Sequence, residues 1–159
     1  MMEHQEVFQF LNKIMETYGN IVKSVVLFGS YARGEAEKES DIDLLVILDD
    51  ERQCREIVKR DIEFLAREIS EKLSVHVYYL TEFFDYARSG QPFVCGVIRD
   101  GVAVYDTGFF APWKQLLREG KNAKANLSGR LLRCDDIFYP SGFNECEAGL
   151  LASTRKALR

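Results

Sequence analysis

Residues 44–48 read Leu-Leu-Val-Ile-Leu, and this uninterrupted apolar run is the feature that most constrains how the chain can fold. Successive side chains of a β-strand point to opposite faces of a sheet, so a strand without polar positions is buried on both faces. The chain is therefore expected to place this strand inside a sheet. Two acids, Asp41 and Asp43, stand at the entry to the same strand.

Asp41 and Asp43 are expected to share one face of the strand because they are two residues apart. They lie about 7 Å from each other along the backbone, so both carboxylates can reach one small cation. Ionised carboxylates beside an apolar run are costly unless they are compensated, and hard oxygen ligands favour Mg²⁺ or Mn²⁺ over zinc. The alternative interpretation is an acidic strand entry that faces solvent.

Gly29 and Ser30 form a tight turn at the end of the preceding apolar segment. Without a β-carbon, Gly29 lets a phosphate approach the backbone. Ser30 can cap a short helix and add a hydroxyl donor, and the free N–H groups of such a turn face anions. Alone, a Gly-Ser pair is more often an ordinary turn. Joined to the two acids on the next strand, it predicts a phosphate cradle opposite a metal clamp.

Helix and strand patterns alternate along the first two thirds of the chain. We expect helices over 4–18, 51–73 and 81–90, a tight turn or short helix at 30–34, and strands at 21–29, 40–48, 74–80 and 102–106. After residue 108 the strand signals stop, and the remainder looks helical with breaks near 120 and 140–142. The fold class is therefore α+β, close to α/β, with a domain over 1–108 and a helical extension over 109–159.

Composition limits the classes of partner and location. The net charge of −4 argues against a chain-wide nucleic-acid surface, although residues 114–133 are locally basic and could face solvent, an acidic partner or RNA phosphates. The four cysteines lack zinc-ligand spacing. No stretch resembles a signal peptide or a membrane span, so a cytoplasmic protein without a membrane partner is expected.

The stretch LFGSYARGEAEKESDIDLLV, with Gly29-Ser30 followed by Asp41-Ile42-Asp43, resembles the signature of the polymerase-β-like nucleotidyltransferases, in particular their minimal prokaryotic members. The close match covers residues 25–48, and a looser one extends to 98–106. The resemblance implies a mixed sheet of about four to five strands with helices packed on one side.

The resemblance also implies a reaction. A nucleoside monophosphate, AMP above all, would pass from a nucleoside triphosphate such as ATP to a hydroxyl group, and pyrophosphate would leave between two metal ions. Asp41 and Asp43 would be catalytic and would hold Mg²⁺ or Mn²⁺. Gly29 and Ser30 would bind the β- and γ-phosphates. Arg33 would be a charge partner of the triphosphate, unless it is a solvated helix arginine.

The third carboxylate of the family's site has no counterpart at the expected position, where this chain has His76. A neutral imidazole can accept a proton and could serve as the catalytic base, but it is a poor magnesium ligand. Two alternatives stay open. His76 could be a structural or lining residue, or the acid could come from Glu82 or Asp85 in the next element.

Minimal members of this family are often encoded beside HEPN ribonucleases as their antitoxins, and some attach AMP to a tyrosine of the toxin. The signature of these ribonucleases needs an arginine followed a few residues later by a histidine, and no histidine follows His76. We therefore expect no such ribonuclease in this tail, and a HEPN-type partner would act in trans. The alternative function is a catalytically weak or inactive nucleotide-binding homologue that neutralises such a partner by direct contact. A third hypothesis is an unrelated α/β protein with coincidental acids. Leu150, Leu151 and Leu158 could pack on the core or mediate self-association.

Overall fold

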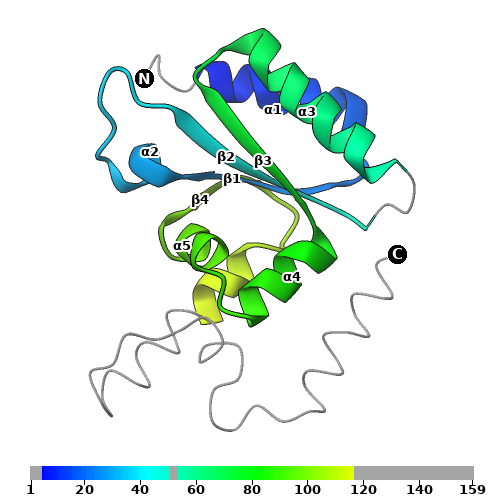
Figure 1. Ribbon diagram of the computed structural model, residues 1–159, viewed down its shortest axis with the longest axis vertical. Coiled ribbons are helices and arrows are strands. Elements are labelled where there is room, and N and C mark those ends of the chain that lie inside the picture. Colours follow the sequence, from blue (N-terminus) through cyan, green and yellow to red (C-terminus); the bar gives the residue numbers. More distant parts are fainter. Residues whose placement is uncertain (1–4, 51–53, 117–159) are drawn as a thin grey trace, which may run out of the picture.

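The computed structural model describes residues 5–50 and 54–116. The elements in these residues, in chain order, are α1 (Gln5–Tyr18), β1 (Val22–Phe28), α2 (Gly29–Arg33), β2 (Ile42–Leu48), α3 (Arg55–Ile69), β3 (Leu73–Tyr79), α4 (Leu80–Arg88), α5 (Pro92–Asp100) and β4 (Val102–Asp106) (Figure 1). Each expected strand is present within one or two residues of its expected bounds. The α+β fold class is confirmed.

The four strands form one mixed sheet in the order β3-β2-β1-β4. β1 runs antiparallel to both β2 and β4, whereas β2 and β3 are parallel. β2 is therefore an interior strand, and the side chains from Leu44 to Leu48 are all fully buried at 0% exposure. The apolar run thus has the environment that its composition predicts.

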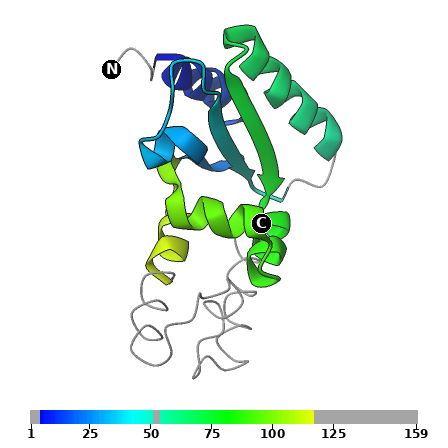
Figure 2. The same cartoon turned by 60° about the vertical axis from the view of Figure 1, so that its left-hand side comes forward.

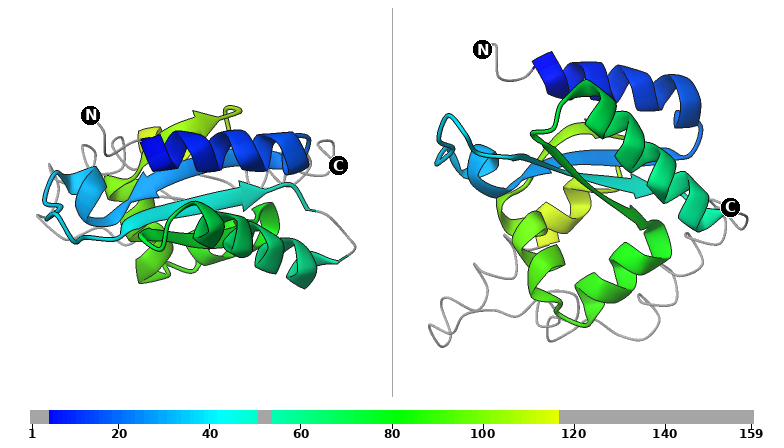
Figure 3. Two further views of the ribbon diagram at one scale, coloured as in Figure 1. Left: turned by 90° about the horizontal axis from the view of Figure 1, so that it is seen from above. Right: turned by 45° about the horizontal axis from the view of Figure 1, so that its top comes forward.

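The two long helices α1 and α3 pack side by side on one face of the sheet (Figure 3). Val7, Phe10 and Ile14 form the buried stripe of α1, at the spacing of an amphipathic helix. Alternate residues of β2, beginning with Ile42, point to this layer. The expected arrangement, with helices packed on one side of the sheet, is confirmed for α1 and α3.

The shorter helices α4 and α5 cover the opposite face and form a second apolar layer (Figure 2). Leu45 and Ile47 of β2 point into this layer, where they meet side chains such as Phe83 of α4. Phe110 and Trp113 complete it from the segment after β4. Because Asp43 has the same strand parity as Leu45, its side chain lies on the α4–α5 face.

The long helix α3 ends earlier than its apolar stripe predicts. The expected helix over 51–73 is wrong at its carboxyl end, since α3 stops at Ile69 and Leu73 already pairs with Ile42 in the sheet. Ser70 is the reason, because its backbone is extended and its hydroxyl accepts a hydrogen bond from Lys72 N–H at 3.2 Å. Residues 51–53 at the other end lie outside the described residues.

Most of the expected helical extension over 109–159 lies outside the described residues, including the basic residues after Lys114 and the leucines at 150, 151 and 158. Its first part, residues 109–116, packs against the second apolar layer through Phe110 and Trp113. The domain boundary at residue 108 stays a prediction. Among the described helices, none combines the length and the apolar character that crossing a membrane requires.

Candidate active site

Gly29 and Asp43 lie in direct contact at one end of the sheet. Phe28, the last residue of β1, is the register partner of Asp43 in β2, so the turn that follows β1 lies beside the start of β2. Gly29 adopts φ 74°, and a β-carbon built on it would come within 2.3 Å of Oδ2 of Asp43. Only glycine fits this position, both for its backbone conformation and for the space that the carboxylate occupies.

Ser30 follows in the short helix α2. Its carbonyl oxygen accepts a hydrogen bond from Glu35 N–H at 2.9 Å, and Gly34, at φ 71°, ends the helix in a left-handed conformation. This tight α2 turn positions the backbone of Gly29 and Ser30 next to Asp43. The proposed phosphate cradle and the acid are thus neighbours, although phosphate binding by Gly29 and Ser30 stays a prediction.

Asp43 is partly buried and electrostatically unfavourable in its ionised form. Burial raises the pKa of the Asp43 carboxyl above its usual value, and the nearby charge of Asp41 raises it further. His76, a hydrogen bond from Ser74 and the charge of Arg33 oppose these effects on the pKa without reversing them. The site therefore concentrates negative charge that an external cation would stabilise.

Asp41 and Arg33 lie at the solvent side of the site. Asp41 is exposed and precedes β2 by one residue. Nε of Arg33 pairs with a carboxylate oxygen of Glu35 at 2.9 Å, and the Arg33 charge also acts on Asp43 and on Asp100 at the end of α5. The guanidinium is thus near the acids, and its exposed ion pair with Glu35 is weak enough to be exchanged for a phosphate.

Ser74 is a site residue that the sequence analysis did not identify. It is the register partner of Asp43 on the parallel strand β3, and its hydroxyl hydrogen-bonds the Asp43 side chain. β1 and β3 flank β2, so Ser74 lies on the other side of Asp43 from Gly29. The strand register could have revealed it, because Asp43 of one strand must pair with a residue near the start of the next.

His76 lies two residues after Ser74 on the same face of β3 and is exposed. Its ring contacts Phe28 and Phe93, with centroids 5.8 and 5.1 Å apart. Its charge lowers the pKa of Asp43, which places it near the acid pair. A role for His76 as catalytic base stays a prediction, while its aromatic contacts correspond to the lining role that the sequence analysis left open.

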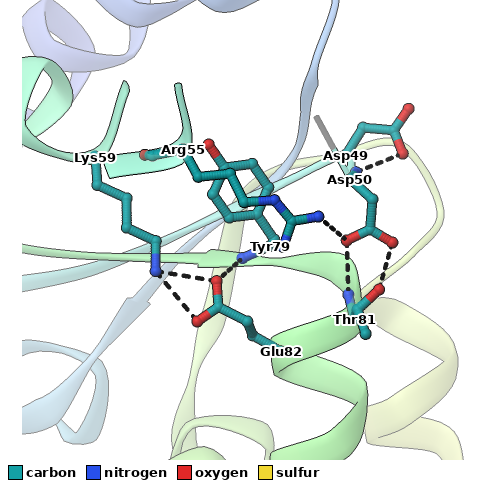
Figure 4. Close-up of polar contacts among 7 residues, drawn as sticks. All are labelled: Asp49, Asp50, Arg55, Lys59, Tyr79, Thr81 and Glu82. Atoms are coloured by element: carbon teal, nitrogen blue, oxygen red, sulfur yellow. Dashed lines mark hydrogen bonds and ion pairs between the residues drawn. The ribbon is translucent and has the colours of Figure 1, made fainter. Parts of the chain in front are cut away.

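Glu82 takes part in a different network of polar contacts, at the carboxyl end of β3 (Figure 4). Its carboxylate accepts a hydrogen bond from Tyr79 N–H at 3.2 Å and pairs with Nζ of Lys59 at 3.0 Å. Asp43 lies near the start of β2, and β2 and β3 are parallel. The carboxyl end of β3 therefore lies at the opposite end of the strands from Asp43. Glu82 therefore does not reach the acid pair. Asp85, the other alternative, is exposed on α4.

The same network contains a second buried acid. The Asp50 side chain is only 2% exposed, accepts a hydrogen bond from Thr81 N–H at 3.1 Å, and faces a guanidinium nitrogen of Arg55 at 3.8 Å (Figure 4). Arg55 also lies over the Tyr79 ring, 4.6 Å from its centroid. These contacts tie α3, β2 and α4 together, which is a structural role.

Asp41 and Asp43 are of the ligand type that magnesium prefers, and a role for them as metal ligands stays a prediction. In the described part of the chain, no group of three or more His, Cys, Asp or Glu side chains could hold a metal. Magnesium is commonly held by one or two carboxylates, with substrate phosphates and waters at the other positions. Asp41 and Asp43 offer a ligand set of this kind, and a cation there would offset the burial that is the main cause of the raised pKa of Asp43.

Comparison with known proteins agrees with this geometry. Residues 8–101 match the nucleotidyltransferase domain family. A protein of Methanocaldococcus jannaschii named "putative protein adenylyltransferase" is 38% identical over 120 residues, which cover 71% of this chain and 77% of that protein. A second protein of that organism and name is 43% identical over 49 residues, 31% of this chain and 49% of its own length. The chain belongs to the nucleotidyltransferase domain family.

Solved structures show more distant similarity. A toxin–antitoxin complex with AMP-PNP superposes with a TM-score of 0.45 at 18% identity, over 77% of this chain and 94% of that one. A protein of Sulfolobus solfataricus described as a "putative nucleotidyltransferase" superposes with a TM-score of 0.42 at 18% identity, over 65% of this chain and 86% of that one. At this identity and TM-score, the similarities give no evidence about the substrate or the partner of this chain.

Proposed function

We propose that the protein transfers AMP from ATP to a hydroxyl group of another protein in a magnesium-dependent reaction. Membership of the family supports the reaction class, and the name of the first relative supports a protein acceptor. The observation that carries the proposal is the contact between Gly29 and the Asp43 carboxylate, because it brings a phosphate-binding type of turn against a metal-binding type of acid.

Each residue of the site has a role in this proposal. The N–H groups of the Gly29–Ser30 turn would bind the terminal phosphates, and Arg33 would exchange Glu35 for phosphate oxygens. Asp41 and Asp43 would hold Mg²⁺. When bound, the metal supplies charge stabilisation for the attacking and leaving oxygens. Ser74, the neighbour of Asp43 on β3, would orient the Asp43 carboxylate through its hydroxyl.

Radiolabelled ATP tests the proposal. Wild-type protein with α-labelled ATP and Mg²⁺ should transfer label to a protein acceptor, and γ-labelled ATP should transfer none. Asp43→Asn should abolish the transfer, while Asp85→Asn, on the exposed side of α4, should not change it. Equal labelling by wild type and Asp43→Asn would contradict the proposal that this site transfers AMP.

The partner class that the sequence resemblance implies is a HEPN-type helical protein in trans. A pull-down with tagged protein from the native host tests it, since a HEPN-type protein should co-purify and accept AMP. Capture of other proteins only would contradict this part of the proposal while leaving the transfer reaction intact.

A second candidate function is nucleotide binding with neutralisation of the partner by direct contact. His76 at the expected place of the third carboxylate favours it, together with the lack of a three-acid group in the described residues. This candidate predicts that Asp43→Asn still neutralises the partner. If neutralisation depends on Asp43 and on ATP, the candidate fails.

A further inference from the structure

Three cations gather on the β4 side of the Gly29–Ser30 turn, and two of them lie outside the motif that predicted the site. Arg33 comes from α2, Arg99 from the last turn of α5, and Lys114 from the segment after β4. We call these three residues the cationic cluster. Its members come from separate parts of the chain, so the fold brings them together.

The Asp100 carboxylate lies among these cations. It accepts hydrogen bonds from Nε and a terminal guanidinium nitrogen of Arg99 at 3.1 and 3.0 Å. These bonds lower the pKa of the Asp100 carboxyl below its usual value, although burial opposes them, and the charges of Arg33 and Lys114 add to the lowering. Nζ of Lys114 also donates to the Arg99 carbonyl oxygen at 3.4 Å. One acid therefore interacts with all three cations.

The pairing of β1 with β4 brings the cationic cluster beside the turn. Val102, the first residue of β4, is the register partner of Leu27. Asp100 precedes Val102 by two residues, and Gly29 follows Leu27 by two. α2 also packs against α5 (Figure 1). The end of β1 thus has the acid Asp43 on its β2 side and the cationic cluster on its β4 side.

Gly96 leaves space beside the Arg99 guanidinium. It lies in the interior of α5, where glycine is less favourable than alanine. Among the described atoms outside its own helix backbone, a β-carbon on Gly96 would come within 4 Å of one, a terminal nitrogen of Arg99 at 3.9 Å. In the described part of the chain, packing therefore does not require a glycine here, and the space can receive another group.

The cationic cluster has the chemistry that a phosphate group needs. A guanidinium binds phosphate oxygens through two donors, and an ammonium binds them as a point charge. The ion pairs of Arg33 and Arg99 are exposed, so phosphate oxygens can compete for their donors. Under the proposed function the reacting phosphate lies beside Asp43, so the phosphates that follow it extend from the turn towards β4.

We propose that the cationic cluster is a subsite for the terminal phosphate of a nucleoside triphosphate, with Asp100 as the residue that positions its side chains. The protein then selects triphosphates over diphosphates. This inference rests on the proposed function, because it takes the Gly29–Ser30 turn as the place of the nucleotide.

Binding of two matched analogues tests the subsite. α,β-Methylene-ATP and α,β-methylene-ADP, each with Mg²⁺, differ by the terminal phosphate. Calorimetry should show that wild type binds the triphosphate at least about tenfold more tightly. Arg99→Gln and Lys114→Gln should each weaken triphosphate binding by about five- to tenfold and leave diphosphate binding unchanged. Arg60→Gln, which removes an exposed cation of α3, is the control and should change neither. Equal affinity of wild type for both analogues, or equal loss of both in Arg99→Gln, would overturn the proposal.

Asp100→Asn distinguishes positioning from simple repulsion by its sign. A carboxylate that only repels phosphate would make the variant bind the triphosphate more tightly. A carboxylate that positions the cations makes it bind about two- to fivefold more weakly, and Asp100→Glu should restore part of the loss. In AMP transfer, KM for ATP should rise while kcat stays unchanged, because the terminal phosphate is remote from the reacting bond. Tighter binding by Asp100→Asn would exclude the positioning role.

Substitution of Gly96 tests whether the space beside Arg99 receives an anion. Gly96→Glu places a carboxylate there, and Gly96→Gln is a matched control of similar size without the charge. Both residues favour a helix more than glycine does, so both variants should fold, which thermal unfolding checks. Gly96→Glu should bind the triphosphate about tenfold more weakly than Gly96→Gln. Equal affinity of the two variants would contradict the proposal.

Binding and transfer together separate this inference from the proposed function. If AMP is transferred while the two analogues bind equally, the subsite is wrong and the proposed function stands. If no AMP is transferred, but wild type prefers the triphosphate and Arg99→Gln loses this preference, the subsite stands and the proposed function fails. If wild type binds neither analogue, both fail.

Discussion

The Asp43 carboxylate occupies the space in which a side chain on Gly29 would begin, since a β-carbon there would lie 2.3 Å from Oδ2. The absence of a side chain on Gly29 thus leaves room for the Asp43 carboxylate, and under the proposed function the same backbone would bind a phosphate. The contact thus joins the Gly29-Ser30 turn to the acid of β2, although α2 and the loop after it separate the two in the sequence.

Gly29→Ala is expected to abolish AMP transfer, with Gly34→Ala as a matched control. Both glycines have similar left-handed backbones, at φ 74° and 71°, but a β-carbon on Gly34 meets nothing within 4 Å. Each substitution should therefore lower the free energy of unfolding by about 1–2 kcal/mol through backbone strain. Only Gly29→Ala also displaces Asp43. Equal activity of the two variants in a labelled-ATP assay would contradict the assignment.

Asp43→Asn is expected to stabilise the metal-free protein while removing its response to Mg²⁺ and ATP. Burial first, and then Asp41, raise the pKa of Asp43, so its stabilising effect is complete below the unfolded pKa and is lost as pH rises through the folded pKa. At neutral pH the ionised group is unfavourable. Because the group is partly exposed, we expect a gain of only about 0.5 kcal/mol.

Thermal unfolding of Asp43→Asn at neutral pH checks both effects. The variant should melt slightly above wild type without ligand. Mg²⁺ with an ATP analogue should raise Tm of wild type and leave that of the variant unchanged, since a ligand stabilises only the state that it binds. A ligand-induced shift of equal size in both proteins would show that Asp43 does not bind the metal–nucleotide complex.

The contact between Tyr18 and Asp61 should make the α1–α3 pairing sensitive to alkali. The Tyr18 hydroxyl donates a hydrogen bond to the Asp61 carboxylate. Burial, this bond and the charge of Asp61 raise the pKa of Tyr18 to about 12. The stabilisation is therefore complete below pH 10 and is lost as pH rises towards about 12.

Tyr18→Phe is expected to cost about 1 kcal/mol of unfolding free energy at neutral pH. Denaturant unfolding followed by Trp113 fluorescence measures the difference, which should shrink as pH rises above 10 and vanish near 12. A difference that stays constant with pH would mean that the hydroxyl stabilises by packing alone.

Asp106→Ala is expected to be the most destabilising single change at the end of the sheet. Oδ1 of Asp106 accepts hydrogen bonds from the Ser24 hydroxyl at 2.6 Å and from three successive N–H groups, while Oδ2 accepts one from Ala111 N–H at 2.9 Å. Loss of these charged hydrogen bonds should cost about 2–4 kcal/mol. Asp100→Ala, which breaks the exposed pair with Arg99, should cost under about 1 kcal/mol.

The same acid predicts a pH effect of opposite sign. Burial alone would raise the pKa of Asp106, but the hydrogen bonds from Phe110, Ser24 and Ala111 outweigh it and hold the pKa below its usual value. Its stabilisation is present above the unfolded pKa and is lost as pH falls through the folded pKa. Wild type should therefore lose its advantage over Asp106→Ala in acid, which unfolding curves at falling pH will measure.

Glu82→Gln tests whether the third carboxylate comes from α4. The change weakens the pair with Lys59 and the cap on Tyr79, so we expect a loss of about 1 kcal/mol in unfolding free energy. AMP transfer should stay at the wild-type level, because Glu82 lies at the opposite end of the strands from Asp43. A tenfold loss of transfer in a folded variant would instead place Glu82 in the reaction.

The sequence was sufficient to predict the strands and the acid motif because both depend on local patterns. The apolar run from Leu44 to Leu48 predicts a buried strand, and alternation along that strand predicts that Asp41 and Asp43 share a face. The second apolar layer was not predictable in this way. Phe83 meets Phe110 and Trp113 only through the fold. The helix α5 was not predicted, although its first residue, Pro92, is of the type that often starts a helix.

The site is less predictable than the motif because it depends on register. Ser74 reaches Asp43, and His76 reaches Phe28, only because β2 and β3 are paired as they are. His76 can be identified from its position in the expected strand. The two phenylalanines that contact it cannot be identified in this way, since they come from other elements, β1 and α5.

The loop between α2 and β2 is a point of tolerance in the molecule. Glu35, Glu37, Lys38 and Glu39 are exposed, while the ends of the loop are fixed by the pairing of β1 with β2. The contact between Gly29 and Asp43 is made at these ends and not by the exposed side chains of the loop. An affinity tag or a fluorescent reporter inserted between Glu37 and Glu39 should leave nucleotide chemistry intact, which makes this loop the natural handle for observing the protein at work.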